Sequence, residues 1–242
     1  MIEIKNVSKT FNRNIKAING VDLTANDGEI VGFIGLNGAG KTTLIKMMTG
    51  VLKPDKGKIL INGKDIVKEP IEAKKQIGYM ADNPDMFLRL TGIEYIHFLS
   101  DIYEVPKEER KKRIDELVKK FQLEEVLDKP MQSYSHGTRQ KMMVVGALVH
   151  NPKVWILDEP LIGLDPQSAI ILKDMMREHV KNNNTVFFST HVLEIAEKLC
   201  DKIAIIDKGK IVYYGTLDEL KKKYKKKDLE ELFVEVISND SV

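Results

Sequence analysis

The clearest pattern along the chain is a set of short apolar runs, each ending in glycine or polar residues. These runs are residues 30–34 (IVGFI), 153–158 (KVWILD) and 185–189 (TVFFS). Apolar runs of this length, bounded by turn residues, predict strands of a parallel sheet that is buried on both faces. Residues 202–207 and 210–215 predict one more pair of strands joined by a turn.

The first part of the chain has a different β pattern. Residues 2–11 and 15–25 predict two β segments separated by a turn at residues 12–14. Residues 58–63 predict another strand that ends in Asn-Gly, a strong hairpin signal, and residues 76–80 a further short one. We therefore expect an N-terminal antiparallel β segment beside the parallel core.

Between about Thr91 and His150 the pattern becomes helical. Thr91 and Glu94 have the spacing of a capping box, and apolar residues then recur at helical spacing, at Ile114, Leu117, Val118 and Phe121. The Lys and Glu residues of 107–120 predict a solvated helix face, and we expect no nucleic-acid binding there. A helical lobe is thus inserted into an α/β core.

The pattern predicts a single domain with a helical end. Asp165 and Pro166 mark the start of a helix that runs to about Asn182. Thr216 and Glu219 cap a later helix, after which the last residues are expected to fray. The expected parts are a core with its β subdomain (about 1–85 and 151–215), a lobe (about 86–150) and a short helical tail (216–242).

Composition limits the class of protein. The 242 residues are 43% hydrophobic and 31% charged with a net charge of +2, which indicates neither disorder nor a strongly basic surface. The lone Cys200 excludes an internal disulfide and suits a reducing compartment. No apolar run approaches the length that spans a bilayer, and the N-terminus lacks a signal-peptide pattern. We expect a cytosolic protein that reaches a membrane only through a partner.

A phosphate-binding motif follows the first apolar run. Gly35, Gly40, Lys41 and Thr42 have the spacing of the P-loop, G-x-x-x-x-G-K-T. The glycines let backbone N–H groups approach phosphate oxygens, Lys41 adds a positive charge, and the Thr42 hydroxyl can bind Mg²⁺. The alternative is an ordinary glycine-rich turn with a surface lysine, which the strand before it and the helix after it disfavour.

Two acids end the second apolar run. An acid at the end of a strand beside a P-loop holds Mg²⁺, directly or through water, and Asp158 fits that position. Glu159 immediately follows and can orient a water molecule or accept its proton. The alternative is that both acids cap the strand and face solvent.

Two further residues, His191 and Phe11, can each have either a structural role or a ligand-binding role. His191 follows the third apolar run, where open α/β sheets bind ligands, although a lone histidine is more often structural. Phe11 is a core aromatic by composition, or a ring on which a nucleotide base stacks.

With these motifs in this order, the sequence resembles the ATP-binding subunit of an ABC transporter along nearly its whole length. The resemblance implies that Glu159 polarises the attacking water, that His191 contacts the γ-phosphate, and that Phe11 stacks on adenine. It implies that Asp165 lies in the D-loop and Asp158 ends the Walker B strand. The Walker A residues that would bind ATP are Asn37, Gly38, Ala39, Gly40, Lys41, Thr42 and Thr43.

The sequence departs from the family pattern in two places. The signature Leu-Ser-Gly-Gly-Gln is represented by residues 134–138, which keep Ser135 and Gly137 but have His136 in place of a glycine. Asp82 stands where the family has the Q-loop glutamine. An ionised acid there can still bind Mg²⁺ or water, but it cannot donate a hydrogen bond.

The resemblance also implies partners. Two such subunits close head to tail, with each ATP between the Walker A loop of one chain and Ser135 of the other. The second subunit is expected to be another copy, although a paralogue is the alternative. A transmembrane permease would dock near residues 86–95, where Phe87, Leu88 and Leu90 are alternatively lobe core. The tail is similar to those of exporter subunits, so we expect an exporter ATPase on the inner face of the cell membrane.

Competing functions have weaker support. A soluble ABC protein acting on ribosomes or DNA generally has two cassettes or a long coiled coil, and this chain has one P-loop and no long heptad run. A GTPase would need an Asn-Lys-x-Asp motif, which is absent. A binder that holds ATP without cleaving it would lack Glu159. The sequence does not name the cargo.

Overall fold

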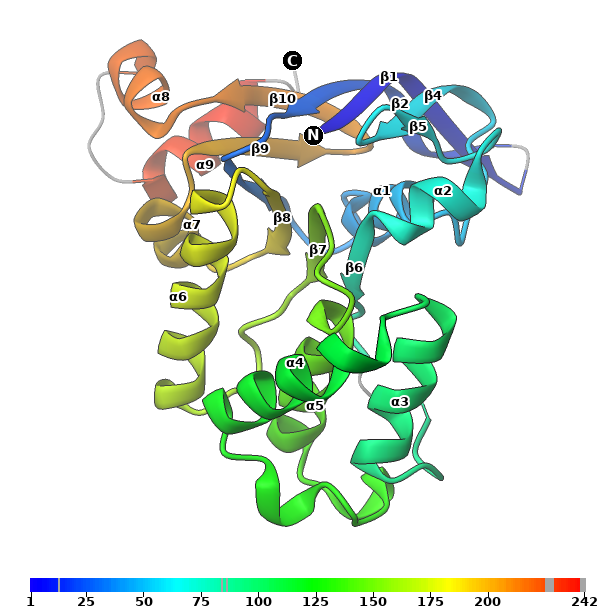
Figure 1. Cartoon of the computed structure of the whole chain (residues 1–242). Helices are drawn as coiled ribbons and strands as arrows, with labels where there is room; N and C mark the ends of the chain where they lie inside the picture. Colours follow the sequence, from blue (N-terminus) through cyan, green and yellow to red (C-terminus); the bar gives the residue numbers. More distant parts are fainter. Residues whose placement is uncertain (13, 84, 86, 225–228, 240–242) are drawn as a thin grey trace.

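A computed structural model describes residues 1–12, 14–83, 85, 87–224 and 229–239 of the 242. In that part of the chain no helix is both long and apolar enough to cross a bilayer. Figure 1 shows two β layers at the top and centre of the molecule and a group of helices below them.

The larger sheet has six strands in the order β10-β9-β3-β8-β7-β6. Its strands are β3 (Ile30–Ile34), β6 (Ile77–Met80), β7 (Val154–Asp158), β8 (Thr185–Thr190), β9 (Lys202–Asp207) and β10 (Lys210–Gly215). All neighbouring pairs are parallel except β9 and β10, so the sheet is mixed, as the sequence predicts. The carboxyl ends of its parallel strands therefore meet at one edge.

The strand before the phosphate loop lies inside this sheet. β3 pairs in parallel with β8 on one side, where Ile30 lies opposite Val186, and with β9 on the other, where Val31 lies opposite Lys202. All five residues of β3 are buried. Both neighbours of β3 thus come from the last quarter of the chain.

The second sheet is antiparallel and has the order β2-β1-β4-β5. It contains β1 (Ile2–Phe11), β2 (Ile15–Ala25), β4 (Lys56–Ile61) and β5 (Lys64–Asp65). The Asn-Gly pair after β4 joins it to β5, which confirms the predicted hairpin. Of the turn predicted between β1 and β2, Arg13 lies outside the described residues. The sequence did not predict the short helix α2 (Pro70–Lys75).

The helix after the phosphate loop, α1 (Lys41–Met48), fills the space between the two sheets. Leu44, Ile45, Met47 and Met48 form one core cluster with apolar residues of β1, β2 and β4 and with one face of the six-stranded sheet. Val31 and Phe33 contribute from β3. This buried packing fixes the direction in which α1 leaves the phosphate loop.

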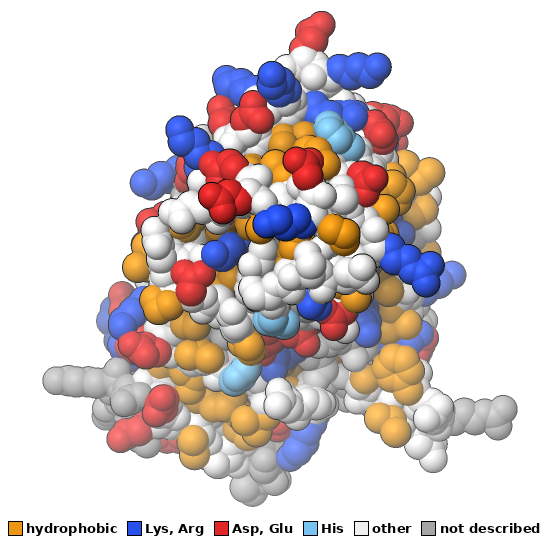
Figure 2. Space-filling model, turned by 90° about the horizontal axis from the view of Figure 1, so that it is seen from below, with side chains coloured by type: hydrophobic (Ala, Val, Ile, Leu, Met, Phe, Trp, Pro, Cys, Tyr) orange, Lys and Arg blue, Asp and Glu red, His pale blue; other side chains and the backbone are white. Residues whose placement is uncertain are grey.

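The opposite face of the sheet contacts the helical lobe. Trp155, Leu157 and Phe188 belong to a second cluster with residues of the lobe helices and α6. The helices are α3 (Gly92–Ile102), α4 (Lys107–Lys120), α5 (His136–Leu148) and α6 (Pro166–Lys181), with short 3₁₀ turns η1 (Glu124–Val126) and η2 (Met131–Ser133). The capping box of Thr91 and Glu94 is present at the start of α3. Figure 2, a view from below, shows Lys and Arg side chains interspersed with Asp and Glu.

Three helices cover the other end of the molecule: α7 (Leu193–Leu199), α8 (Leu217–Tyr224) and α9 (Leu229–Asn239). Leu229, Leu232, Phe233 and Val236 of α9 are buried in a third cluster with Ile203 and Ile205 of β9. Both α8 and α9 lie in the tail 216–242 that the sequence predicts to be helical, and the fraying expected of the last residues does not extend to residues 229–239. Of the lysine run 221–227, residues 225–227 lie outside the described residues.

Candidate active site

The phosphate loop between β3 and α1 has the backbone that its glycines predict. Gly38 and Gly40 have φ angles of 83° and 114°, in the region that side chains disfavour. A Cβ on Gly40 would lie 2.6 Å from the carbonyl oxygen of Ala17 in β2. The N–H of Ala39 donates to Leu36 at 3.1 Å. The loop is thus a tight turn closed against the antiparallel sheet.

Lys41 is held inside this loop. Its Nζ donates to the carbonyl oxygen of Gly35 at 2.7 Å and lies 3.7 Å from Oε1 of Glu159. The side chains of Lys41 and Glu159 are only 7% and 11% exposed, so their charges interact with little screening by solvent. A lysine in this position can interact with the phosphates of a nucleotide.

Asp158 is anchored by the neighbouring strand. It is 2% exposed, and Oγ of Ser189 donates to its Oδ1 at 2.5 Å. The same hydroxyl accepts a hydrogen bond from the N–H of Glu159 at 3.0 Å. Ser189 was not predicted as a site residue, and its only signal in the sequence is its place at the end of a parallel strand.

Glu159 has an unusual backbone and a histidine neighbour. Its φ angle is 50°, uncommon for a residue with a side chain. Its Oε1 lies 3.1 Å from Nδ1 of His191, whose side chain is 49% exposed. Its Oε2 is buried and has no hydrogen-bond partner among the described residues. The strained turn thus presents a carboxylate with one oxygen available for another group.

A cavity of about 220 Å³ collects most of the predicted residues. A Cβ on Gly38 would meet no described heavy atom within 4 Å, so the loop is open on that side. The lining residues are Ala17, Leu36, Asn37, Gly38, Gly40, Lys41, Thr42, Thr43, Asp82, Asp158 and Glu159. Ala39, within the loop, is buried and does not line the cavity. His191 does not line it either, but it contacts the carboxylate of Glu159, which does. Strand ends and loop therefore form one polar site.

Asp82 lies on the cavity wall next to the end of β6. Burial, together with the negative charges of Asp158 and Asp82, raises the pKa of nearby Tyr79 to about 12. The acid in the predicted Q-loop position therefore belongs to the same electrostatic environment as Asp158.

The carboxylate of Asp158 fits a divalent cation. Its Oδ2 is buried and has no hydrogen-bond partner within the described residues, so it can accept a metal-bound water or the metal itself. Among all the residues that the structure describes, no group of three or more His, Cys, Asp or Glu side chains is arranged so that it could hold a metal. Mg²⁺ is commonly bound by one or two carboxylates and by the phosphates of its substrate, and the unpartnered Oδ2 of Asp158 has the chemistry of such a ligand.

Besides Ala39 and His191, four predicted residues do not line this cavity. Phe11, at the end of β1, is 39% exposed, and Nζ of Lys9 lies 5.9 Å from its ring centre. Ser135 is exposed at the N-terminus of α5, where its Oγ accepts from the N–H of Thr138 at 3.2 Å. Gly137 follows in the first turn of that helix. None of these three residues lines the cavity that contains Lys41.

Asp165, the fourth of them, caps α6. It accepts hydrogen bonds from the N–H and hydroxyl of Ser168 at 2.9 and 2.6 Å, and Nζ of Lys141 lies 3.0 Å away. The hydrogen bonds from Ser168 hold the pKa of Asp165 well below its usual range, and the ammonium group of Lys141 lowers it further. The predicted helix start is confirmed, and Asp165 connects α6 to α5.

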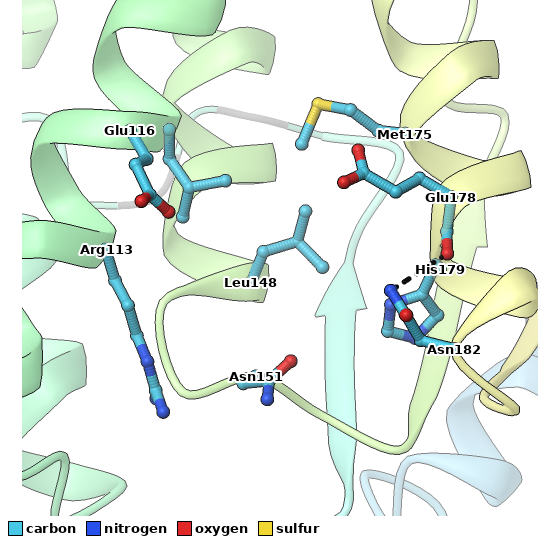
Figure 3. Close-up of a pocket in the computed structure, with 9 residues that line it drawn as sticks. Arg113, Glu116, Leu148, Asn151, Met175, Glu178, His179 and Asn182 are labelled. Carbon is cyan, nitrogen blue, oxygen red and sulfur yellow. Dashed lines mark hydrogen bonds between the residues drawn. The ribbon is translucent and has the colours of Figure 1, made fainter.

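Another cavity, of about 300 Å³, contains none of the predicted residues. It lies between α4, the end of α5 and α6 (Figure 3), with Arg113 on one side and His179 and Asn182 on the other. The strand ends and the phosphate loop are not part of it. We therefore place the candidate active site at the smaller cavity.

Comparison with known proteins gives consistent results. A family model described as ABC transporter matches residues 18–162, more than half of the chain. The chain is 34% identical to the ABC transporter ATP-binding protein NatA of Bacillus subtilis (strain 168), with 97% of each chain covered. It is 35% identical to the ABC-type transporter ATP-binding protein EcsA of the same organism, covering 100% of this chain and 98% of EcsA. The daunorubicin resistance ATP-binding protein DrrA3 of Streptomyces coeruleorubidus is 34% identical, over 85% of this chain and 65% of DrrA3.

Solved structures agree with these relatives. The structure of an ATP-binding subunit of an ABC transporter superposes with a TM-score of 0.94 at 33% identity, covering 98% of this chain and 99% of that one. A dimeric ATP-binding cassette in a post-hydrolysis state, bound to ADP and Pi, has a TM-score of 0.81 at 25% identity, with 90% and 99% covered.

Proposed function

Because this chain belongs to the ABC transporter family of ATP-binding ATPases, we propose that it powers the export of a cargo by a transmembrane permease. The observation that carries the proposal is the cavity in which Lys41 of the phosphate loop meets Asp158 and Glu159 from the end of β7. A cation beside two acids, in a pocket lined by a glycine-rich loop, suits the binding and cleavage of a nucleoside triphosphate.

ATP binding is assigned to the phosphate loop. The backbone of Asn37, Gly38 and Gly40 would surround the phosphates, and Lys41 would exchange its bond to Gly35 for phosphate oxygens. Thr42 and Asp158, with Asp82 on the cavity wall, would hold Mg²⁺. When bound, Mg²⁺ supplies positive charge that neutralises the phosphate oxygens.

Hydrolysis is assigned to Glu159 and His191. Glu159 lines the cavity, and its Oε2 has no hydrogen-bond partner among the described residues, so this carboxylate can orient a water molecule and accept its proton. His191 contacts the other oxygen of the same carboxylate, which fixes the direction of the group. His191 would also contact the γ-phosphate once ATP is bound.

A second subunit is needed because three of the proposed ATP contacts do not reach the cavity. Ser135, Gly137 and Asp165 lie on the surface at the starts of α5 and α6. Head-to-tail pairing of two copies would place these residues against the ATP held by the partner. The similarity to a dimeric cassette supports this pairing. Phe11, exposed at the end of β1, would stack on the adenine ring.

The permease is proposed to dock on an aromatic surface of the lobe. Phe87 is 37% exposed and its ring lies 5.5 Å from that of Tyr95 and 5.6 Å from that of Phe98. Met86, the first residue of the predicted docking segment, lies outside the described residues. Docking there would hold this subunit at the inner face of the cell membrane. Export is supported by the similarity to a daunorubicin resistance protein.

The first experiment measures the molar mass of Glu159→Gln in solution with and without Mg²⁺ and ATP, together with ATPase rates. We expect ATP to double the mass of this variant, and its kcat to fall about 10²- to 10⁴-fold, because loss of a general base removes that much. Glu108→Gln, an exposed acid of α4, is the matched control and should hydrolyse ATP like the unaltered chain.

The outcomes separate the parts of the proposal. If Glu159→Gln binds ATP but remains monomeric, the working partner is a different chain or the permease. If Lys41→Ala binds ATP as tightly as the unaltered chain, the assignment of the phosphate loop is wrong.

A further inference from the structure

The departure from the signature pattern at His136 has a counterpart elsewhere in the chain. Gly163 lies in the segment 160–165 that joins β7 to α6, and its φ angle is 79°. A Cβ placed on Gly163 would lie 2.6 Å from Cδ2 and 3.0 Å from Nε2 of His136. The imidazole ring therefore rests directly on the backbone of Gly163, where no larger residue fits without moving it.

Neighbouring residues of α5 contact the same segment. A Cβ on Gly137 would lie 2.9 Å from the carbonyl oxygen of Gly163, and one on Gly163 would lie 3.3 Å from Oε1 of Gln140. Lys141 pairs with Asp165 at 3.0 Å. His136, Gly137, Gln140 and Lys141 belong to the first two turns of α5, and each lies against Gly163 or Asp165. We name these four residues the α5 contact face.

The segment that this face holds leads back to the active site. Gly163 is four residues after Glu159, and the N–H of Ile162 donates to the carbonyl oxygen of Glu159 at 3.4 Å. Ser135, at the other end of the contact, immediately precedes His136. The contact between His136 and Gly163 thus connects the turn that carries Glu159 to the turn that carries Ser135.

We infer that His136 is a positioning residue for ATP hydrolysis: by resting on Gly163 it fixes the Glu159 turn relative to the Ser135 turn. The inference rests on the proposed function, in which Ser135 meets the partner's ATP while Glu159 acts on the chain's own. A glycine at position 136 would leave a gap above Gly163. Segment 160–165 would then be free to shift, and the two turns would no longer move together.

The test is a double-mutant cycle of His136→Gly and Gly163→Ala, with kcat and the ATP affinity of the monomer measured separately. We expect His136→Gly to lower kcat about tenfold and to change ATP affinity less than about twofold, since the phosphate loop is untouched. Gly163→Ala should lower kcat about 30-fold in the unaltered chain but about threefold in the His136→Gly background, where the clash with the imidazole is gone and only the backbone strain and the contact with Gln140 remain.

The matched control is His97→Ala, which removes an exposed histidine from α3 and should leave kcat unchanged. If the two substitutions are additive in kcat, or if His136→Gly has the kcat of the unaltered chain, the inference is overturned while the proposed function stands. If the unaltered chain does not hydrolyse ATP, both fail. Should Gly163→Ala not fold, the kcat and affinity of His136→Gly alone decide the matter.

Discussion

At the scale of single residues, the orientation of both acids in the active site depends on one hydroxyl. Oγ of Ser189 donates to Asp158 and accepts from the N–H of Glu159, so β8 holds the end of β7 in place. The hydroxyl is fully buried, where water cannot replace it. Ser189 therefore orients the two acids of the active site and also contributes to the stability of the strand pair.

Ser189→Ala tests this dependence. Without the hydroxyl, Asp158 would have both carboxylate oxygens unpartnered and the Glu159 turn would lose its anchor. We expect kcat to fall about tenfold or more, and the free energy of unfolding to fall by about 1–3 kcal/mol. Steady-state kinetics and urea unfolding measure the two effects.

The matched control is Ser100→Ala. Ser100 is also fully buried, and its hydroxyl donates to the carbonyl oxygen of Ile96 inside α3, away from the active site. This variant should keep the kcat of the unaltered chain. An equal loss of kcat in both variants would mean that Ser189 acts only through stability.

Some residues of the candidate active site could be predicted from the sequence and others could not. Lys41, Asp158 and Glu159 were predictable because the P-loop spacing and the strand ends restrict where a phosphate site forms. Ser189 was not, because its role depends on the pairing of β7 with β8, which no local pattern encodes. Roles for Ser135 and Asp165 remain predictions, since one copy of the chain leaves both away from the cavity.

At the scale of elements, α9 contributes more than its place at the chain end suggests. Leu229, Leu232, Phe233 and Val236 recur at i, i+3, i+4 and i+7 and are buried against β9 and α7. The sequence predicts a helical tail over 216–242, but it does not predict that this tail is buried against the sheet. Helix α2 was missed for another reason: six residues are too few to show a helical period.

Leu232→Ala tests the packing of α9. Leu232 is 0% exposed, so its truncation should lower the free energy of unfolding by about 2–4 kcal/mol. Val234→Ala is the matched control on the same helix, since Val234 is 65% exposed and should cost under about 0.5 kcal/mol. Equal midpoints of urea unfolding for the two variants would show that α9 is not packed on the sheet.

At the scale of the whole molecule, two neutral histidines lie where the lobe meets the core. His150 stacks on Tyr103 with ring centres 3.7 Å apart, and its Nε2 lies 3.0 Å from the carbonyl oxygen of Ile77. His179 of α6 contacts Trp155 of β7 edge-on. Burial lowers the pKa of each histidine from 6.5 to about 4. Folding therefore opposes their protonation.

The pH dependence of stability follows from these pKa values. Between pH 6.5 and 4 the unfolded chain binds more protons than the folded one, so the free energy of unfolding falls as pH falls through that window. Between pH 7 and pH 5, each of the two histidines should lower the free energy of unfolding by about 2 kcal/mol.

In the variant His179→Gln, the side chain at position 179 cannot be protonated. Between pH 7 and pH 5 the free energy of unfolding of this variant should therefore fall by about 2 kcal/mol less than that of the unaltered chain. Urea unfolding at pH 7 and pH 5 measures the difference. The double variant with His150→Gln should show about twice the effect. Identical pH dependence in the unaltered chain and both variants would contradict the assigned burial of the two imidazoles.

The place of β3 in the six-stranded sheet determines when the nucleotide site can form during synthesis. β3 and the phosphate loop leave the ribosome early, but both strands that hydrogen-bond to β3 lie within residues 185–207. Asp158 and Ser189 also emerge late. Pairing between segments so distant in sequence forms slowly and only after both exist. A nascent chain that ends before β9 therefore carries the Walker A sequence but lacks one of the two strands that pair with β3.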